Sequence, residues 1–467
     1  MPEDAHAGTP PAVTGEVAAF IAATDLGAIP APVLERGRVH MLDTVGLALA
    51  GAQAPATTIL RDHVAALGAT GAASVVGTPM RTAPRFAALI NGTAMHADNF
   101  DDTAPQHTPR RNGGIHVSAA VLPAVLALAE ERGLGGADVT TAYHVGVELA
   151  CKLNHAIDMR HYQSGYHVTG TLGAFGAAAA AARLLGLDET GIANALAGAA
   201  SRASGLRANF GFMVEQAHTG MAAESGLVAA DLAARGMTGA PDILEATAGW
   251  FDVSGGVEAD VIRGRLGNPW VFADPGISIK PWPSGSMTHA GLTLLKDMMR
   301  THGFTAAGVA RLVVRTNARI AATLRHPAPA TALQAKFSMP FCLAVMLVTG
   351  DAGIDVMTDG MVADPDIRAV IGRIAYQTFA TEAPGYTNLT TLIDVHLADG
   401  TVHKGRADFA RGSNRAPMAW DDALDKFMGC AAHGKWDAGR ARDAAAMVAE
   451  LETLPDVRPL VRLLAPA

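Results

Sequence analysis

One run of small apolar residues constrains the fold of this chain more than any other segment. It extends from Val168 to Ala182, consists mostly of Ala and Gly, and is closed by Arg183. The run is shorter than the roughly 20 residues that a membrane-spanning helix requires. Because small side chains let helix axes come close together, it predicts a helix packed inside the protein. A second such segment, Ala193–Ala203, predicts the same.

Apolar residues recur at helical spacing over much of the rest of the chain. The clearest segments are Glu35–Ala50, Val117–Glu130, Asp138–Lys152 and the tail from Trp420 to Leu464. The pattern changes after Trp250, where Gly and Pro become frequent. Beyond that point, strand-like alternation predicts three strands, at Val309–Thr316, Leu392–Leu397 and Thr401–Ala407. The last two flank Asp399-Gly400, which is a hairpin signal.

These segments together predict a mostly α fold. We expect a large all-helical domain built from both chain ends, residues 1–265 and 409–467, and an inserted smaller α+β lid domain at 266–408. Length alone is consistent with two or three domains, since domains usually have about 100–200 residues.

Charge and cysteine usage exclude several classes of protein. The formal net charge is -8 and the Lys and Arg residues form no run, so no nucleic-acid partner is expected. The N-terminus carries acids and prolines, unlike a signal peptide, and no membrane segment is evident.

The three cysteines, Cys151, Cys342 and Cys430, are far apart and lack CxxC spacing. This pattern indicates buried free thiols and a reducing cytoplasm.

The densest polar cluster runs from His96 to Thr103 and includes Asp98, Asp101 and Asp102. His107, Arg110, Arg111 and His116 follow it. Carboxylates and imidazoles are the usual general acids and bases. Two other interpretations stay open: Asp, Asn and Thr also cap helices, and His96 with the three acids could bind a metal. Asp101-Asp102 lacks the third acid of diphosphate-binding motifs, because Pro105 stands there, so we expect no metal site.

Two further residues are candidates for chemistry. His167 lies just before the Ala-rich run, where a helix N-terminus would favour its neutral form, as suits a base. Lys280 follows an apolar strand-like run and precedes two prolines, so it sits on a rigid loop where it could bind a carboxylate or transfer a proton. Taken singly, a structural His and a solvated surface Lys are the simpler interpretations.

The order and spacing of these motifs resemble those of the MmgE/PrpD family, which includes 2-methylcitrate dehydratases, cis-aconitate decarboxylases and iminodisuccinate epimerases. The matching segments include Leu42–Gly46, Asn91–Thr103, His116–Pro123, Ala142–Lys152, His167–Gly173, Ile243–Phe251 and Lys280–Gly285. The resemblance implies a proton-transfer site between a helical and a lid domain, in a homodimer without a cofactor. It also implies that His116, His167, Thr103 and Lys280 line that site.

Several positions depart from the family pattern. Asn99 stands where the family often has Asp, and Glu215 aligns with a Lys of the decarboxylases. Gly285 and Phe341 align with their His and Tyr. A carboxylate facing an anionic substrate weakens binding unless it is protonated or paired. The departures therefore argue against cis-aconitate decarboxylation.

The expected activity is abstraction of a proton next to a carboxylate of a small di- or tricarboxylate. We expect His116 and His167 as the acid–base pair, Lys280 as anion stabiliser or proton donor, and Thr103 with Asp102 as orienting groups. The expected substrate contacts are Asp98, Asn99, Asp101, Arg110, Arg111, Glu215, His218 and Ser284. Dehydration by a carbon–oxygen lyase is favoured; the alternatives are an epimerase and a catalytically inactive binding or structural dimer.

Overall fold

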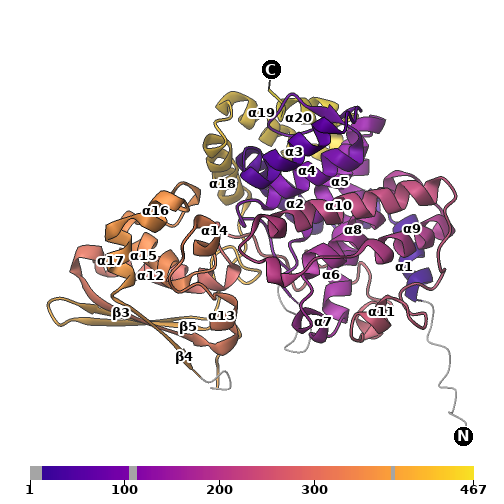
Figure 1. Cartoon of the computed structure of the whole chain (residues 1–467). Coiled ribbons are helices and arrows are strands. Elements are labelled where there is room, and N and C mark those ends of the chain that lie inside the picture. Colours follow the sequence, from indigo (N-terminus) through magenta and orange to yellow (C-terminus); the bar gives the residue numbers. More distant parts are fainter. Residues whose placement is uncertain (1–12, 105–112, 380–383, 467) are drawn as a thin grey trace, which may run out of the picture.

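The computed structural model describes residues 13–104, 113–379 and 384–466. Figure 1 shows a large helical part beside a smaller part in which helices cover a sheet. The helices of the large part are α1 (Val13–Ala23), α2 (Ala31–Gly51), α3 (Pro55–Ala66), α4 (Pro84–His96), α5 (Val117–Arg132), α6 (Gly136–Ala156), α7 (Arg160–Gln163), α8 (Val168–Leu184), α9 (Glu189–Arg202), α10 (Met213–Ala234), α11 (Trp250–Val253), α18 (Trp420–His433), α19 (Ala438–Ala449) and α20 (Arg458–Leu463). A short hairpin of β1 (Ala73–Ser74) and β2 (Arg81–Thr82) joins α3 to α4.

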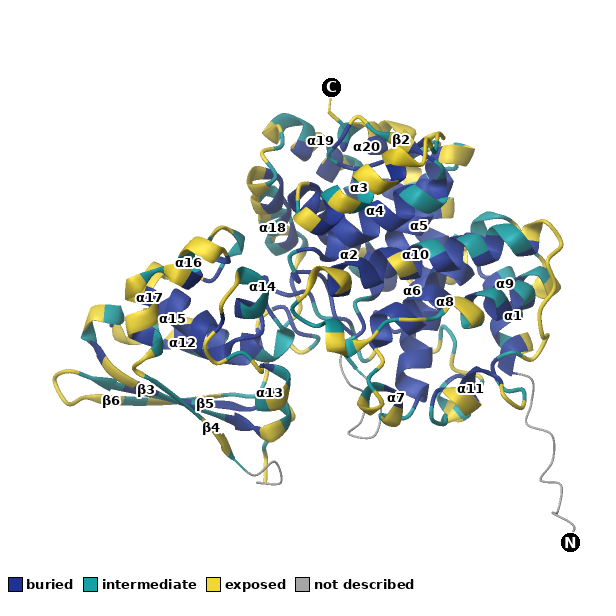
Figure 2. Ribbon diagram, in the orientation of Figure 1, coloured by how far each residue is buried: buried dark blue, intermediate teal, exposed yellow. Residues whose placement is uncertain are grey.

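Helix α8 forms the centre of the large part, as the Ala/Gly-rich run predicts. Every residue from Val168 to Ala182 is buried, and α5, α6, α9 and α10 pack around the helix (Figure 2). Glycines make the close approach possible. A Cβ added to Gly226 of α10 would lie 2.4 Å from the backbone nitrogen of Ala178 in α8.

The predicted helices at 35–50, 117–130 and 138–152 are confirmed as α2, α5 and α6. The small side chains of α8 are buried within the chain's own core, as expected for a helix packed inside the protein.

The smaller part contains a four-stranded sheet in the order β4-β3-β5-β6. Its strands are β3 (Val309–Asn317), β4 (Ile374–Phe379), β5 (Thr391–Leu397) and β6 (Val402–Ala407). Its helices are α12 (His289–His302), α13 (Ala318–Thr323), α14 (Ala332–Ala335), α15 (Met339–Thr349), α16 (Asp359–Ala363) and α17 (Pro365–Ile371). The hairpin predicted at Asp399-Gly400 is confirmed: β5 and β6 are antiparallel, and Gly400 has a φ of 91°.

Buried apolar side chains form two main clusters that follow these two parts. One runs from Val13 to Ile279 and resumes from Met418 to Leu464, whereas the other lies between Trp282 and Val395. The mostly α character is thereby established, while the domain boundaries at 266 and 408 remain a prediction. Within the described ranges, no helix combines the length and the hydropathy that crossing a membrane would need. All three cysteines are buried and free, as expected.

Candidate active site

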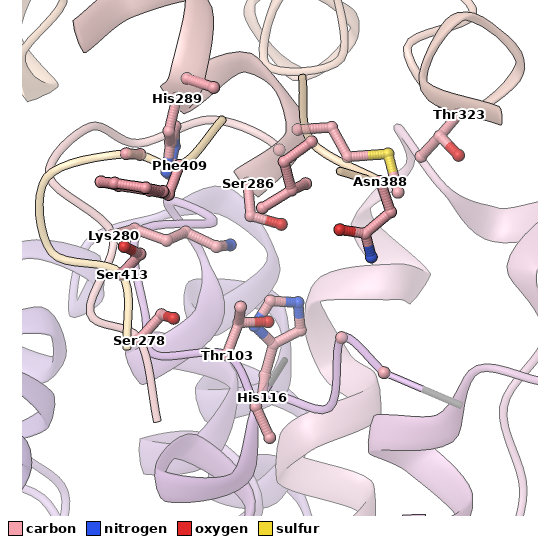
Figure 3. Close-up of a pocket in the computed structure, with 18 of the residues that line it drawn as sticks. Thr103, His116, Ser278, Lys280, Ser286, His289, Thr323, Asn388, Phe409 and Ser413 are labelled. Atoms are coloured by element: carbon pink, nitrogen blue, oxygen red, sulfur yellow. The ribbon is translucent and has the colours of Figure 1, made fainter. Parts of the chain in front are cut away.

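A cavity of about 390 Å³ lies where the helical part meets the sheet-containing part. Thr103, His116 and Lys280 project toward a common space in Figure 3, with Ser286 and Asn388 facing them from the sheet-containing part. His167 and Glu215 also line the cavity. The structure thus brings together residues that are nearly 300 positions apart in the sequence.

The polar loop after α4 is held by lysines from elsewhere in the chain. It turns at Asn99, whose φ of 52° lies in the left-handed region that Asn tolerates. Lys280 Nζ donates to the Asn99 backbone oxygen at 3.0 Å and also to Asn99 Oδ1. Lys336 Nζ donates to Asp98 Oδ1 at 3.0 Å. Lys280 is therefore buried, and its interpretation as a solvated surface residue is wrong.

A buried chain of charges runs behind the cavity wall from Asp101 through His96 to Glu215. His96 Nδ1 lies 2.7 Å from Asp101 Oδ2, and His96 Nε2 lies 2.9 Å from Glu215 Oε1. Burial opposes protonation of His96, but the two carboxylates outweigh it and raise its pKa to about 9. At neutral pH His96 is an imidazolium that donates to both carboxylates. The negative charge of Glu215 is thus paired with a cation that it shares with Asp101.

His116 differs from His96 in its charge, because its ring is neutral. Its Nδ1 donates to the backbone oxygen of Asp102 at 2.8 Å and lies 3.4 Å from Asp101 Oδ2. Burial, together with the positive charges of Lys280 and His96, lowers the pKa of His116 to about 3. The ring is neutral with its proton on Nδ1, so Nε2 carries a lone pair that can accept a proton.

The side chain of Asp102 is held by contacts behind the cavity wall. Its carboxylate accepts from the backbone nitrogen of Ser118 at 3.2 Å, and also from the Ser118 hydroxyl, so it caps the N-terminus of α5. Asp102 Oδ2 is 2.9 Å from His40 Nδ1. These contacts fix the carbonyl that holds His116. Asp102 therefore lies behind the wall of the cavity, and its backbone oxygen is the one that contacts His116.

His167 occupies the N-cap position of α8, as the sequence predicts. Its Nδ1 lies 2.9 Å from Nδ1 of His218, so one of these nitrogens donates to the other. The pKa of His167 is well below its ordinary value, chiefly because the ring is buried. The ring centroids of His116 and His167 are 6.3 Å apart in an edge-on arrangement.

The other predicted contact residues differ in position. Asn99, Thr103 and Glu215 line the cavity, whereas Asp98, Asp101, Asp102, His218 and Ser284 do not. Ser284 is buried, with its hydroxyl bonded to Thr288 Oγ1 at 2.7 Å. Arg110 and Arg111 lie outside the described residues. Ser284 is thus bonded to Thr288, and Asp98 is paired with Lys336, and neither is among the residues that line the cavity.

Sequence reasoning missed several residues that line the cavity, among them His289, Asn388, Arg319 and Arg415. His289 Nε2 has no hydrogen-bond partner among the residues that the structure describes, and burial lowers the pKa of the ring to about 3. Its place nine residues after Lys280, at the start of the amphipathic helix α12, was a signal that could have been used. Asn388 and Arg415 stand in loops without a recognisable pattern.

His96, Asp101 and His116 place potential metal-ligand atoms within 4.8 Å of one another. The donors, however, are already engaged: both nitrogens of His96 and Nδ1 of His116 direct protons at oxygen atoms. Lys280 Nζ, 3.6 Å from Asp101 Oδ1, adds a positive charge that disfavours a cation. The geometry fits a hydrogen-bonded charge cluster better than a ligand set.

Chelation tests this interpretation. Activity is expected to survive dialysis against EDTA, because the possible metal ligands His96, Asp101 and His116 already bond to other protein groups. The measurement is turnover before and after dialysis, with each divalent ion added back singly. Loss of activity that one added ion restores would contradict the interpretation.

Two family profiles match the chain and together cover most of it. The MmgE/PrpD N-terminal domain matches residues 15–260, and the MmgE/PrpD C-terminal domain matches residues 282–453. The chain belongs to the MmgE/PrpD family. The family resemblance seen in the sequence motifs is thereby confirmed.

Relatives of this MmgE/PrpD chain include proteins named cis-aconitate decarboxylase. The human protein is 27% identical over 465 residues, covering 97% of this chain and 94% of its own length. The mouse protein is 26% identical, with 97% and 93% covered. A protein of Aspergillus terreus is 25% identical, with 97% and 96% covered. The similarity therefore extends over the full length of both MmgE/PrpD domains.

Proposed function

We propose that this MmgE/PrpD protein is a cofactor-free lyase that acts on a small di- or tricarboxylate. It removes a proton next to a carboxylate and then breaks a carbon–oxygen bond. The base takes the proton, the electron pair of the C–H bond forms a double bond, and the hydroxyl leaves as water after receiving a proton. This is the reaction type of a 2-methylcitrate dehydratase.

The observation that carries the proposal is the state of His116. Its Nδ1 is committed to the Asp102 carbonyl, so a neutral ring offers Nε2 as a base at the cavity wall. The low pKa of His116 results from burial and from the positive charges of Lys280 and His96. An anionic substrate would bring negative charge close to the ring and raise that pKa toward neutrality.

Besides a base, the reaction needs positive groups that stabilise the negative charge that develops on the substrate as the proton leaves. Lys280 is buried at the inner wall, while Arg319 and Arg415 also line the cavity. The Lys280 ammonium is 3.6 Å from Asp101, which holds it in place without a direct short contact. We assign Lys280 to the developing carboxylate charge and the arginines to the outer carboxylate.

The relatives favour a lyase over an epimerase, because they are named as decarboxylases, which are lyases. The rings of His116 and His167 lie edge-on with their centroids 6.3 Å apart, so both are within reach of one small substrate. We assign them to successive steps, which are removal of the substrate proton and protonation of the leaving hydroxyl.

A substrate screen tests the proposal. Citrate, methylcitrate, aconitate, tartrate and iminodisuccinate isomers are incubated with the protein, and products are followed by proton NMR. The proposal expects an unsaturated product from a hydroxy acid. Interconversion of stereoisomers without unsaturation would favour the epimerase, and release of carbon dioxide from aconitate would favour decarboxylation. Binding without turnover of any acid would favour the inactive dimer.

We also propose a homodimer. Large apolar side chains are exposed from the loop before α10 into its first turns, at Leu206, Phe212, Met213, Val214 and Met221. Sedimentation at micromolar concentration is expected to give a dimer whose interface exceeds about 1,000 Å². Phe212→Glu is expected to weaken it, because a charge would be buried there. A monomeric wild type, or a dimer unaffected by the substitution, would contradict this assignment of the interface.

A further inference from the structure

Glu215 places a negative charge on the wall of a cavity that is proposed to bind anions. It lies in the first turn of α10 and lines the cavity, although its exposed fraction is only 5%. Burial favours the neutral acid, but the neighbouring His96 imidazolium lowers the pKa of Glu215, so the carboxylate is ionised. An ionised, buried carboxylate at a ligand cavity requires a chemical explanation.

Only part of this carboxylate is satisfied by the protein. His96 donates to Oε1 at 2.9 Å, and no donor among the described residues reaches Oε2. His96 is moreover shared, because its other nitrogen serves Asp101 at 2.7 Å. His167 and His218, which lie nearby, have lowered pKa values and are neutral. Glu215 therefore retains both negative charge and an unused acceptor toward the cavity.

We infer that Glu215 selects substrates that carry a hydrogen-bond donor, either a hydroxyl or a protonated amine, close to their carboxylates. The inference rests on the proposed function and narrows its substrate class. A plain dicarboxylate would bring only negative charge toward Glu215 and would leave Oε2 without a donor. A hydroxy or amino dicarboxylate donates a proton to Oε2 while its carboxylates reach the lysine and arginines.

Three four-carbon dicarboxylates of equal chain length separate these cases. Succinate has no donor, malate has a hydroxyl, and aspartate has an ammonium group. Titration calorimetry of the full-length protein with each is expected to show malate and aspartate binding at least about tenfold more tightly than succinate, since hydrogen bonds to charged groups are the stronger kind. Equal affinities for all three would overturn the inference without any variant.

The variant Glu215→Gln distinguishes the two donors. Gln keeps the shape and an oxygen that accepts from His96, but it has no charge. The preference for aspartate over succinate is expected to fall by about tenfold or more, because the amide NH2 that replaces Oε2 cannot accept from an ammonium group. The preference for malate is expected to fall by less, because the oxygen of a hydroxyl can accept from that NH2. Glu224→Gln, nine residues further along α10 and paired with Arg85, is the matched control and is expected to change neither preference. Unchanged preferences in Glu215→Gln would overturn the assignment.

Failure of this inference differs from failure of the proposed function. If the three acids bind equally, the cavity still takes small dicarboxylates and only the selection by Glu215 is wrong. If none of them binds, the proposed carboxylate substrate is contradicted, and the inference about Glu215 falls with it.

Discussion

Replacing His116 with Asn is expected to lower kcat by about 10²–10⁴ and to change KM little, because general acid–base groups contribute rate enhancements of that order. Asn can still donate to the Asp102 carbonyl through its amide, but it has no ring nitrogen to take a proton. The melting temperature is expected to remain close to that of the wild type. Steady-state kinetics per folded molecule, with a thermal melt of each variant, are the measurements.

The opposite pattern would show a structural histidine. A lower melting temperature with nearly intact kcat per folded molecule would remove His116 from the mechanism. His63→Asn, at an exposed position in the last turn of α3, is the matched control and is expected to change neither quantity. His167→Asn extends the comparison. If His167 delivers the proton to the leaving hydroxyl, this variant should still remove the substrate proton while departure of the hydroxyl becomes slow.

Replacing Lys280 with Met is also expected to lower kcat strongly, but by removing a positive charge and not by removing a base. Removal of one preorganised charge-stabilising donor typically lowers kcat by about 10²–10³. Met has a similar length and fills the same space. It leaves the Asn99 carbonyl without its donor and Asp101 with His96 as the remaining close cation. Removing one member of a buried charged pair also lowers the free energy of unfolding, by about 3 kcal/mol.

Kinetics and denaturant unfolding separate the two consequences of this change. Lys296→Met is the control, because Lys296 is half-exposed and pairs with Asp351 at the surface. It is expected to change the free energy of unfolding by less than about 1 kcal/mol and to leave turnover unchanged. A Lys280→Met protein that is destabilised but keeps wild-type turnover per folded molecule would limit Lys280 to supporting the loop at Asn99.

Local patterns in the sequence were sufficient for much of the fold. Helix α8 was predictable because a run of Ala and Gly is stable only where neighbouring helices approach closely. The β5–β6 hairpin was predictable because Asp-Gly suits the positive φ that Gly400 adopts. Strand β4 was not foreseen. It pairs in parallel with β3, more than 50 residues earlier in the chain, and such pairing has no local signal.

The candidate site was only partly predictable for the same reason. Individual residues such as His116 and Lys280 could be singled out by type and by motif order. Their charge states depend on partners that are distant in sequence. The imidazolium of His96 exists because Asp101 and Glu215 meet it from two directions, although Glu215 is 119 residues away. The sequence showed a Glu in a site expected to bind an anion, and only the fold shows the His96 cation that pairs with it.

The central claim is that His116 removes a proton from the carbon next to a carboxylate. It is tested most directly with a substrate found in the screen and deuterated at that carbon. Proton NMR and mass spectrometry then follow the label during turnover by the wild type and by His116→Asn. The proposal predicts that the wild type releases the deuterium to water and that the variant releases it about 10²–10⁴ times more slowly. A product that retains the deuterium, or release by the variant at the wild-type rate, would contradict the claim.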